Sequence, residues 1–100
     1  MNSAAFALLC AAMAAGGSAR AGDVLAGADL YRRHCVGCHG ADGRPVLPVA
    51  PDFSKPTALL KSDLSLLASI RSGSGAMPAY AGQLRDREIL DIVAHLRRLR

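Results

Sequence analysis

The sequence predicts an all-α fold of three or more short helices in a single small domain. Two segments show helical periodicity, a stretch rich in proline separates the predicted helices, and no region alternates apolar and polar residues as strands do. Only four of the 100 residues are aromatic, and none is Trp. Removal of the predicted signal peptide described below would leave 79 residues, and below roughly 70–80 residues a polypeptide core rarely suffices by itself. We therefore expect a bound group to complete the core.

The first 21 residues have the pattern of a secretory signal peptide. Residues 4–15 form an uncharged apolar run, and Ala19-Arg20-Ala21 is an A-x-A cleavage pattern. The run is shorter than the roughly 20 apolar residues that span a bilayer. No Lys or Arg precedes it, so an uncleaved anchor stays as an alternative. Cys10 follows Leu9, where a lipoprotein signal would have a small residue, and we interpret it as part of the signal.

We therefore expect a signal peptide over residues 1–21, one domain over residues 22–100, and export to the periplasm. Cleavage would leave 79 residues and lower the formal net charge from +4 to +3. The basic residues are scattered and are not interleaved with aromatic ones, a pattern that disfavours nucleic-acid binding. No stable membrane insertion is expected of the mature chain.

The first helix is predicted over residues 26–35. Gly27 and Tyr31 are four residues apart and so share one face, and we expect Gly27 to let a second helix approach closely, with Tyr31 packing against Leu96 or a neighbour. Residues 41–57 should form a loop, because their prolines and glycine leave little room for regular structure. These residues are Gly43, Pro45, Pro48, Pro51 and Pro56.

The second helix is predicted over residues 62–72. Ser62 is a candidate N-cap, and Gly73 is a candidate stop. We expect Leu64, Leu67 and Ala68 to form its apolar face.

The clearest helix is predicted over residues 86–99. Acidic residues come early and arginines late, as the helix macrodipole favours. The alternative interpretation of the arginines is a docking patch for an acidic partner. The apolar face of this helix consists of Ile89, Ile92, Val93, Leu96 and Leu99.

Residues 35–39 read Cys35-Val36-Gly37-Cys38-His39 and form the C-x-x-C-H signature of c-type haem attachment. Two residues between the cysteines place both sulfurs on one turn of backbone, where each thiol can add to a haem vinyl group as a thioether. His39 follows directly and can supply the proximal imidazole ligand of the iron. The motif therefore predicts one covalently bound haem c.

Two other interpretations of this motif, a zinc site and a redox dithiol, have less support from the sequence. A structural zinc site needs four Cys or His ligands, and the third cysteine of the chain, Cys10, lies in the predicted signal. A redox dithiol is expected beside a βαβ unit, and the sequence shows no such unit.

Met77 is the candidate for the second axial ligand. It is the only methionine outside the predicted signal, and it lies in an irregular stretch that could place a thioether over the iron. Pro78 stiffens the backbone directly after it. A Met/His pair raises the reduction potential of haem. His34 is expected at the surface, and His95 is expected to be a partly exposed helix residue.

The imidazole of His39 should also donate its other ring N–H to a carbonyl group, because ligating histidines are usually oriented in this way. Pro48 and Pro51 both follow in the loop, and the sequence does not choose between them.

With its C-V-G-C-H motif, the segment Met77-Pro78-Ala79-Tyr80 and an amphipathic C-terminal helix, the chain resembles class I cytochromes c of the small bacterial mono-haem type. The resemblance covers residues 26–99. It implies an all-α fold around one haem c, ligation by His39 and Met77, thioethers at Cys35 and Cys38, and an electron-carrier function. The family often has a Ser-type N-cap where this chain has Arg85.

Within the family, three stretches resemble small cytochromes associated with dissimilatory nitrite reduction. They are residues 70–73, 77–80 and 86–89. This narrower resemblance implies delivery of electrons to a nitrite reductase in denitrification.

The sequence thus predicts a periplasmic one-electron carrier, monomeric and not an enzyme, which docks weakly with redox proteins, including acidic ones. No pair of carboxylates or Cys/His/Asp constellation suggests acid–base or nucleophilic catalysis. Two alternatives stay open. One is a haem protein with an open or labile sixth site that acts as an enzyme, a sensor or a factor in reductase cofactor maturation. The other is a haem subunit of a larger oxidoreductase complex.

Overall fold

The computed structural model describes residues 22–99. The predicted signal peptide and its cleavage site lie outside the described residues. Within residues 22–99, four α-helices and one 3-10 turn follow each other, and this part of the chain contains no strand beyond two isolated bridges. In order, the elements are α2 (Val24–His34), α3 (Val36–His39), η1 (Pro56–Leu59), α4 (Asp63–Ser72) and α5 (Asp86–Leu96). The predicted all-α fold is confirmed.

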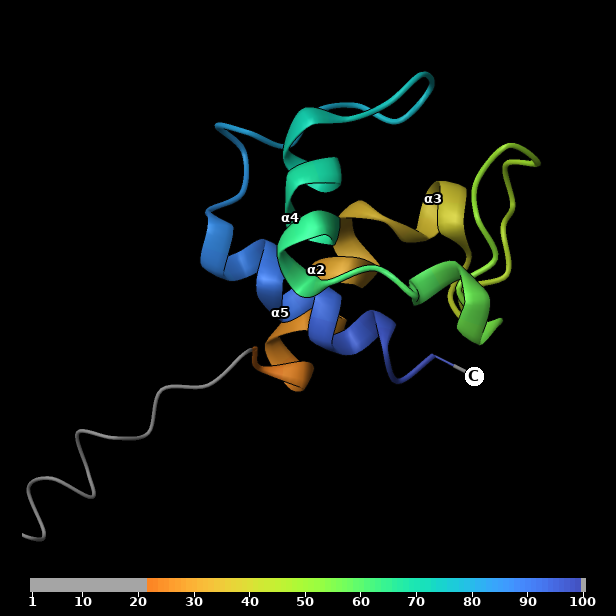
Figure 1. The fold of residues 1–100 in the computed structure, drawn as a ribbon, viewed down its shortest axis with the longest axis horizontal. Coiled ribbons are helices and arrows are strands. Elements are labelled where there is room, and N and C mark those ends of the chain that lie inside the picture. The colour runs from red at the N-terminus through yellow and green to blue at the C-terminus, as the bar shows by residue number, and fades with distance from the viewer. Residues whose placement is uncertain (1–21, 100) are drawn as a thin grey trace, which may run out of the picture.

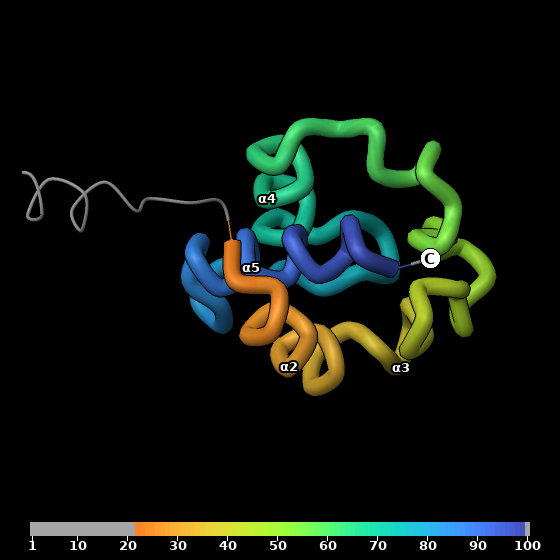
Figure 2. Tube along the Cα trace, turned by 90° about the horizontal axis from the view of Figure 1, so that it is seen from below, coloured from red at the N-terminus to blue at the C-terminus, as the bar shows by residue number. Residues whose placement is uncertain are grey.

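Helix α5 lies at the centre of the fold, with α2 packed on one side and α4 on another (Figure 1; Figure 2). Its apolar stripe is almost fully buried: Ile89, Ile92 and Val93 are at most 1% exposed, and Leu96 is 3% exposed. Burial of such side chains contributes roughly 1.5–3 kcal/mol each. This stripe is the largest part of the hydrophobic core.

Helices α2 and α5 are in backbone contact at Gly27. A Cβ atom at this position would lie 1.8 Å from the carbonyl oxygen of Asp91. The buried carboxylate of Asp91 also accepts a hydrogen bond of 2.8 Å from the backbone N–H of Asp23. Asp23 in turn caps α2 by accepting from two N–H groups of its first turn. The close approach predicted at Gly27 is confirmed.

Helix α2 begins two residues earlier than predicted, because Asp23 is its N-cap, and it ends at His34. Cys35 interrupts the helix and starts the short helix α3. Tyr31 is 2% exposed and belongs to the same core as Leu96, while its ring lies 5.0 Å from the ring of His95.

Helix α4 has the predicted caps but a different buried face. The hydroxyl of Ser62 accepts from the N–H of Ser65, and Gly73 ends the helix with a positive φ of 71°. Leu64 is 69% exposed and Ala68 is exposed, so the predicted apolar face is wrong at these two positions, whereas Leu67 packs on the core as predicted. The face packed on the core consists of Leu66, Leu67 and Ile70.

Helix α5 ends at Leu96 rather than Leu99. The N–H groups of Arg98 and Leu99 donate to the carbonyl groups three residues earlier, so the chain leaves the α-helical pattern there. Arg97 leaves the helix and joins it to the start of α4. Its guanidinium donates to the carboxylate of Asp63 and to the carbonyl groups of Leu59 and Lys61. At the other end, Glu88 accepts from the N–H of Arg85, so a carboxylate caps the helix that lacks a Ser-type N-cap.

The contact at Gly27 gives a first testable prediction. Gly27→Ala should destabilise the haem-loaded protein by about 3 kcal/mol, because the added methyl overlaps the backbone of α5 and forces the two helices apart. The free energy of unfolding in urea measures this effect.

The matched control is Gly37→Ala in α3, where an added Cβ meets no atom within 4 Å. This change should leave the stability unchanged or raise it by about 0.5 kcal/mol. Equal effects of the two substitutions would contradict the proposed tight contact between α2 and α5.

Candidate functional site

The C-x-x-C-H motif forms a single turn of helix at the end of α2. Cys35 closes α2 and accepts backbone hydrogen bonds from Cys38 at 3.3 Å and His39 at 2.9 Å. This turn brings both thiols and the imidazole to one cavity. The two cysteines are not joined in a disulfide.

Burial, reinforced by the nearby Cys38, raises the pKa of the Cys35 thiol to about 11. At neutral pH Cys35 is therefore a protonated thiol. Reactive dithiols instead lower the pKa of one cysteine to generate a thiolate. Cys35 is therefore not the thiolate that a redox dithiol would require.

His39 is only 8% exposed and stacks on Phe53, with the ring centroids 4.7 Å apart. Burial lowers the pKa of its imidazole. A lowered pKa keeps the ring neutral near pH 7, which is the form that binds a metal. Its Nδ1 is buried without a hydrogen-bond partner. Neither of the predicted acceptors, the carbonyls of Pro48 and Pro51, is bonded to it.

Two contacts fix the backbone around His39. The hydroxyl of Tyr31 donates to the carbonyl of Gly40 at 2.6 Å, and burial raises the pKa of Tyr31 to about 12, so this donor stays protonated. The carbonyl of Cys38 accepts from the N–H groups of Val46 and Leu47 at 2.9 and 3.0 Å. The motif is thus held from the α2 side and from the loop that follows it.

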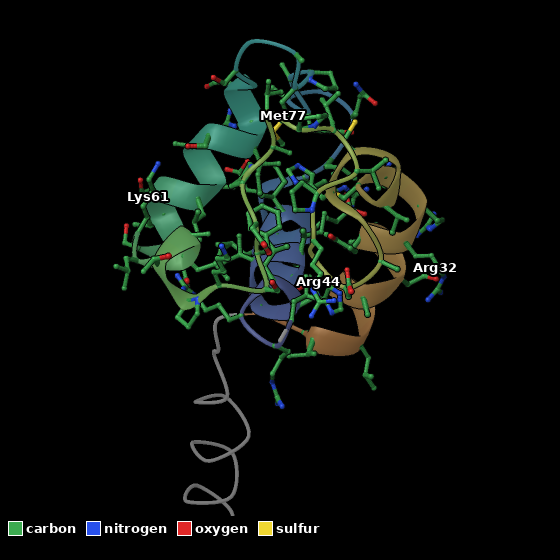
Figure 3. The ribbon with its side chains drawn as sticks, turned by 90° about the vertical axis from the view of Figure 1, so that its right-hand side faces the viewer. Arg32, Arg44, Lys61 and Met77 are labelled. Atoms are coloured by element: carbon green, nitrogen blue, oxygen red, sulfur yellow. The ribbon has the colours of Figure 1, made fainter. Side chains whose placement is uncertain are left out.

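Met77 comes from the stretch between α4 and α5, here called the Met77 segment (residues 73–84). A tight turn pairs the backbones of Ser74 and Met77 in both directions, at 3.0 and 2.9 Å. Gly73 permits this turn, since it has a φ of 71° and a Cβ there would lie 2.6 Å from the carbonyl oxygen of Met77. The N–H groups of Tyr80 and Ala81 then donate to the last turn of α4. Figure 3 shows Met77 at one end of the face that also carries the loop after α3.

One cavity of about 200 Å³ brings these residues together. Its walls come from the motif, from the loop at residues 47–51 and from the Met77 segment. No Lys, Arg, Asp or Glu of the described residues lines it. The lining residues are His34, Cys35, Cys38, His39, Leu47, Val49, Ala50, Pro51, Ser74, Ala76, Met77, Pro78 and Tyr80.

The donor set of this cavity fits a c-type haem. Two thiols, a neutral imidazole with one buried unpaired nitrogen, and a thioether face an apolar space. Several lining residues are exposed, among them Cys38, Val49, Ala76 and Pro78, so the cavity is open to solvent. Its volume lies below the roughly 300–1,000 Å³ typical of ligand pockets, and a porphyrin would extend into this opening.

All four predicted site residues, Cys35, Cys38, His39 and Met77, line this cavity. His34 is exposed as expected and adds to the rim, whereas His95 lies outside the cavity.

Sequence reasoning assigned no role at the cavity to Tyr80 or Phe53, and in the loop at residues 47–51 it considered only the carbonyl groups of Pro48 and Pro51. Of these, only Tyr80 could have been singled out from the sequence, because it is an aromatic residue three positions after Met77. No helix within residues 22–99 is long and apolar enough to cross a membrane.

Comparison with known proteins finds relatives among the c-type cytochromes. The sequence profile of the family described as "Cytochrome C oxidase, cbb3-type, subunit III" matches residues 22–96. Cytochrome c6 of Bryopsis maxima is 35% identical over 79 residues, which cover 75% of this chain and 90% of that protein. Cytochrome c6 of Thermosynechococcus vestitus is 33% identical over 83 residues, which cover 79% of this chain and 72% of the relative.

Two solved structures share the fold. The c-type cytochrome KustC0563 superposes with a TM-score of 0.69 at 28% identity and covers 74% of this chain and 96% of its own. Cytochrome c6 of the diatom Phaeodactylum tricornutum superposes with a TM-score of 0.63 at 32% identity and covers 75% of this chain and 91% of its own. The chain belongs to the class I c-type cytochromes, small electron carriers that contain one covalently bound haem c.

Proposed function

We propose that the chain holds its haem through thioether bonds at Cys35 and Cys38, with His39 and Met77 as the axial ligands. The observation that carries this proposal is the single cavity in which all four side chains meet. The environment of His39 supports it, because the imidazole is buried at this cavity and its lowered pKa favours the neutral form that binds a metal.

Each residue then has a defined task in electron transfer. The bound haem supplies a reversible one-electron couple. His39 contributes a neutral donor, because burial keeps its proton affinity low. Met77 contributes a soft thioether, which favours the reduced iron and raises the potential. The apolar walls exclude water, and two ligands that stay in place limit reorganisation between the two redox states.

The electron-exchange surface is the open side of the cavity, around Cys38 and Val49. Both are exposed, and Val49 is 78% exposed. An apolar rim of this kind suits brief encounters, which typically bury less than about 1,200 Å².

We further propose a nitrite reductase as the electron acceptor, which rests on the sequence resemblance at residues 70–73, 77–80 and 86–89. Exposed basic residues such as Arg32 and Lys61 would steer an acidic partner toward the protein. Figure 3 shows Arg32 and Lys61 on opposite sides of the molecule, pointing outward. Arg32 and Arg33 are both paired with Asp29 at the exposed end of α2, which weakens their contribution to steering.

Residues 1–21 are proposed to direct export to the periplasm and to be removed after Ala21. The family profile begins at residue 22, and the cap of α2 follows at Asp23, which supports a mature domain over residues 22–100. The mature protein is proposed to act as a monomer.

A second candidate function is that of a haem subunit in a larger oxidoreductase complex. The description of the matched family, an oxidase subunit, favours it. The two candidates differ in where the protein is found. A free carrier should appear in the periplasmic fraction as a small monomer, whereas a subunit should co-purify with a larger membrane complex.

Ligation by Met77 is tested by Met77→Ala. The ferric protein should lose the weak red band of an iron–thioether bond, its reduction potential should fall, and cyanide should bind at least about tenfold faster, equivalent to ~1.4 kcal/mol. Optical spectra, potentiometry and stopped-flow mixing provide these measurements.

The control is Met77→Leu, which keeps the apolar volume of the side chain but lacks the sulfur. It should lose the band as Met77→Ala does. A wild-type protein that already lacks the band and binds cyanide rapidly would overturn the carrier function in favour of an open sixth site.

Removal of the cofactor gives another prediction. Chain produced without haem attachment should be largely unfolded, because the cavity walls would lack the apolar surface that they enclose. Circular dichroism should show little helix and no cooperative melting. A compact apo-protein with a cooperative transition would contradict this prediction.

The acceptor is tested by mixing reduced protein with a purified nitrite reductase. A rate that falls as salt increases indicates electrostatic steering by the basic residues. A rate that is insensitive to salt would assign docking to the apolar rim, and the absence of electron transfer would exclude this acceptor.

A further inference from the structure

The hydroxyl of Tyr80 bridges the two sides of the cavity. It donates a 3.0 Å hydrogen bond to the backbone carbonyl of His34, 46 residues earlier in the chain. The two rings also meet edge to face, with centroids 6.0 Å apart. Both residues line the cavity, and His34 directly precedes Cys35. One phenol therefore connects the Met77 segment to the residue before the first cysteine.

The other hydrogen bonds of the Met77 segment stay on its own side. Ser74 and Met77 bond to each other, and the N–H groups of Tyr80 and Ala81 donate to Ile70 and Arg71 at the end of α4. Among the hydrogen bonds of residues 22–99, the bond from Tyr80 to His34 is the only one that joins residues 73–84 to residues 34–51. The segment is thus anchored at its α4 end and fastened across the cavity at one point.

The position of this bond matters for Met77. Tyr80 follows Met77 by three residues, and the intervening Pro78 and Ala79 are exposed. Ala76 and Gly75 on the other side of Met77 are exposed as well. The tip of the segment therefore has little packing of its own. When the hydroxyl bond opens, the turn that carries Met77 can move away from the motif while the anchors on α4 persist.

We propose that Tyr80 is a positioning residue that keeps Met77 over the haem by fastening the Met77 segment to the carbonyl of His34. This contact is called the Tyr80–His34 latch. The inference rests on the proposed ligation by Met77 for its functional consequence. The latch sets how often the thioether leaves the iron, and hence how readily an external ligand enters.

Tyr80→Phe in the haem-loaded protein tests the latch, because it removes only the hydroxyl. Backbone amide exchange of Ser74 and Met77 should become about fivefold faster, equivalent to ~1 kcal/mol for one neutral hydrogen bond. The amides of Ile92 and Val93, buried in α5, should keep their wild-type rates. Cyanide binding to the ferric protein should accelerate by a similar factor, with the iron–thioether band still present.

The matched control is Gln83→Ala. The Gln83 amide donates to the carbonyl of Ala79 at 3.3 Å, within the Met77 segment and on one side of the cavity. This change should leave both rates at their wild-type values. Wild-type amide rates in Tyr80→Phe, or an unchanged cyanide rate with the band present, would overturn the positioning role of Tyr80.

His34→Ala separates the hydroxyl from the ring contact. It removes the imidazole but keeps the carbonyl that accepts the bond, so both rates should change less than in Tyr80→Phe. An effect as large as that of Tyr80→Phe would assign the fastening to the ring contact and overturn the latch.

Failure of the proposed ligation gives a different result. Wild-type protein would then bind cyanide as fast as Met77→Ala, while Tyr80→Phe would still accelerate amide exchange in the Met77 segment. That outcome would support the latch as a contact and reject Met77 as the ligand.

Discussion

The close approach of α2 and α5 at Gly27 is the constraint on which the rest of the structure depends. With no side chain between them, the two backbones meet, and the buried carboxylate of Asp91 joins α5 to the start of α2. This contact orients α2, and α2 ends where the haem motif begins. From the same helix, Tyr31 reaches the carbonyl of Gly40 just beyond the motif. A shift between these helices would therefore move Cys35 and His39 together.

The opposite side of the cavity is built on α4, which packs on another part of α5. The last turn of α4 holds the Met77 segment through Tyr80 and Ala81, while Arg97 ties the end of α5 to Asp63 at the start of α4. The two sides of the cavity are thus held by helices α2 and α4, which both pack on α5. The cavity keeps its shape as long as both helix pairs hold, and the Tyr80–His34 latch adds a direct connection at the rim.

The features of the fold and site that were predictable from sequence are those that a short stretch of residues determines by itself. The C-x-x-C-H spacing, the Ser62 cap and the Gly27 approach each depend on neighbouring residues or on the absence of one side chain. The face of α4 was not predictable in this way, because leucines at positions 64, 66 and 67 allow more than one apolar stripe. Packing on α5 selects Leu66 and leaves Leu64 exposed. Tyr80 and the loop at residues 47–51 belong to no helical or strand-like sequence pattern. Only the tertiary structure brings them to the cavity.

The low charge of the cavity and of its proposed ligands affects the redox state that a bound haem iron prefers. The proposed ligands are both neutral, since burial keeps the imidazole of His39 unprotonated and a thioether carries no charge. No charged carboxylate, ammonium or guanidinium of the described residues lines the walls. A site of low polarity disfavours the state with the greater net charge. Such a site favours the reduced iron, in the same direction as the thioether of Met77. Under the proposed ligation, an anchored Met77 segment would add to this preference for the reduced iron by supplying the sulfur.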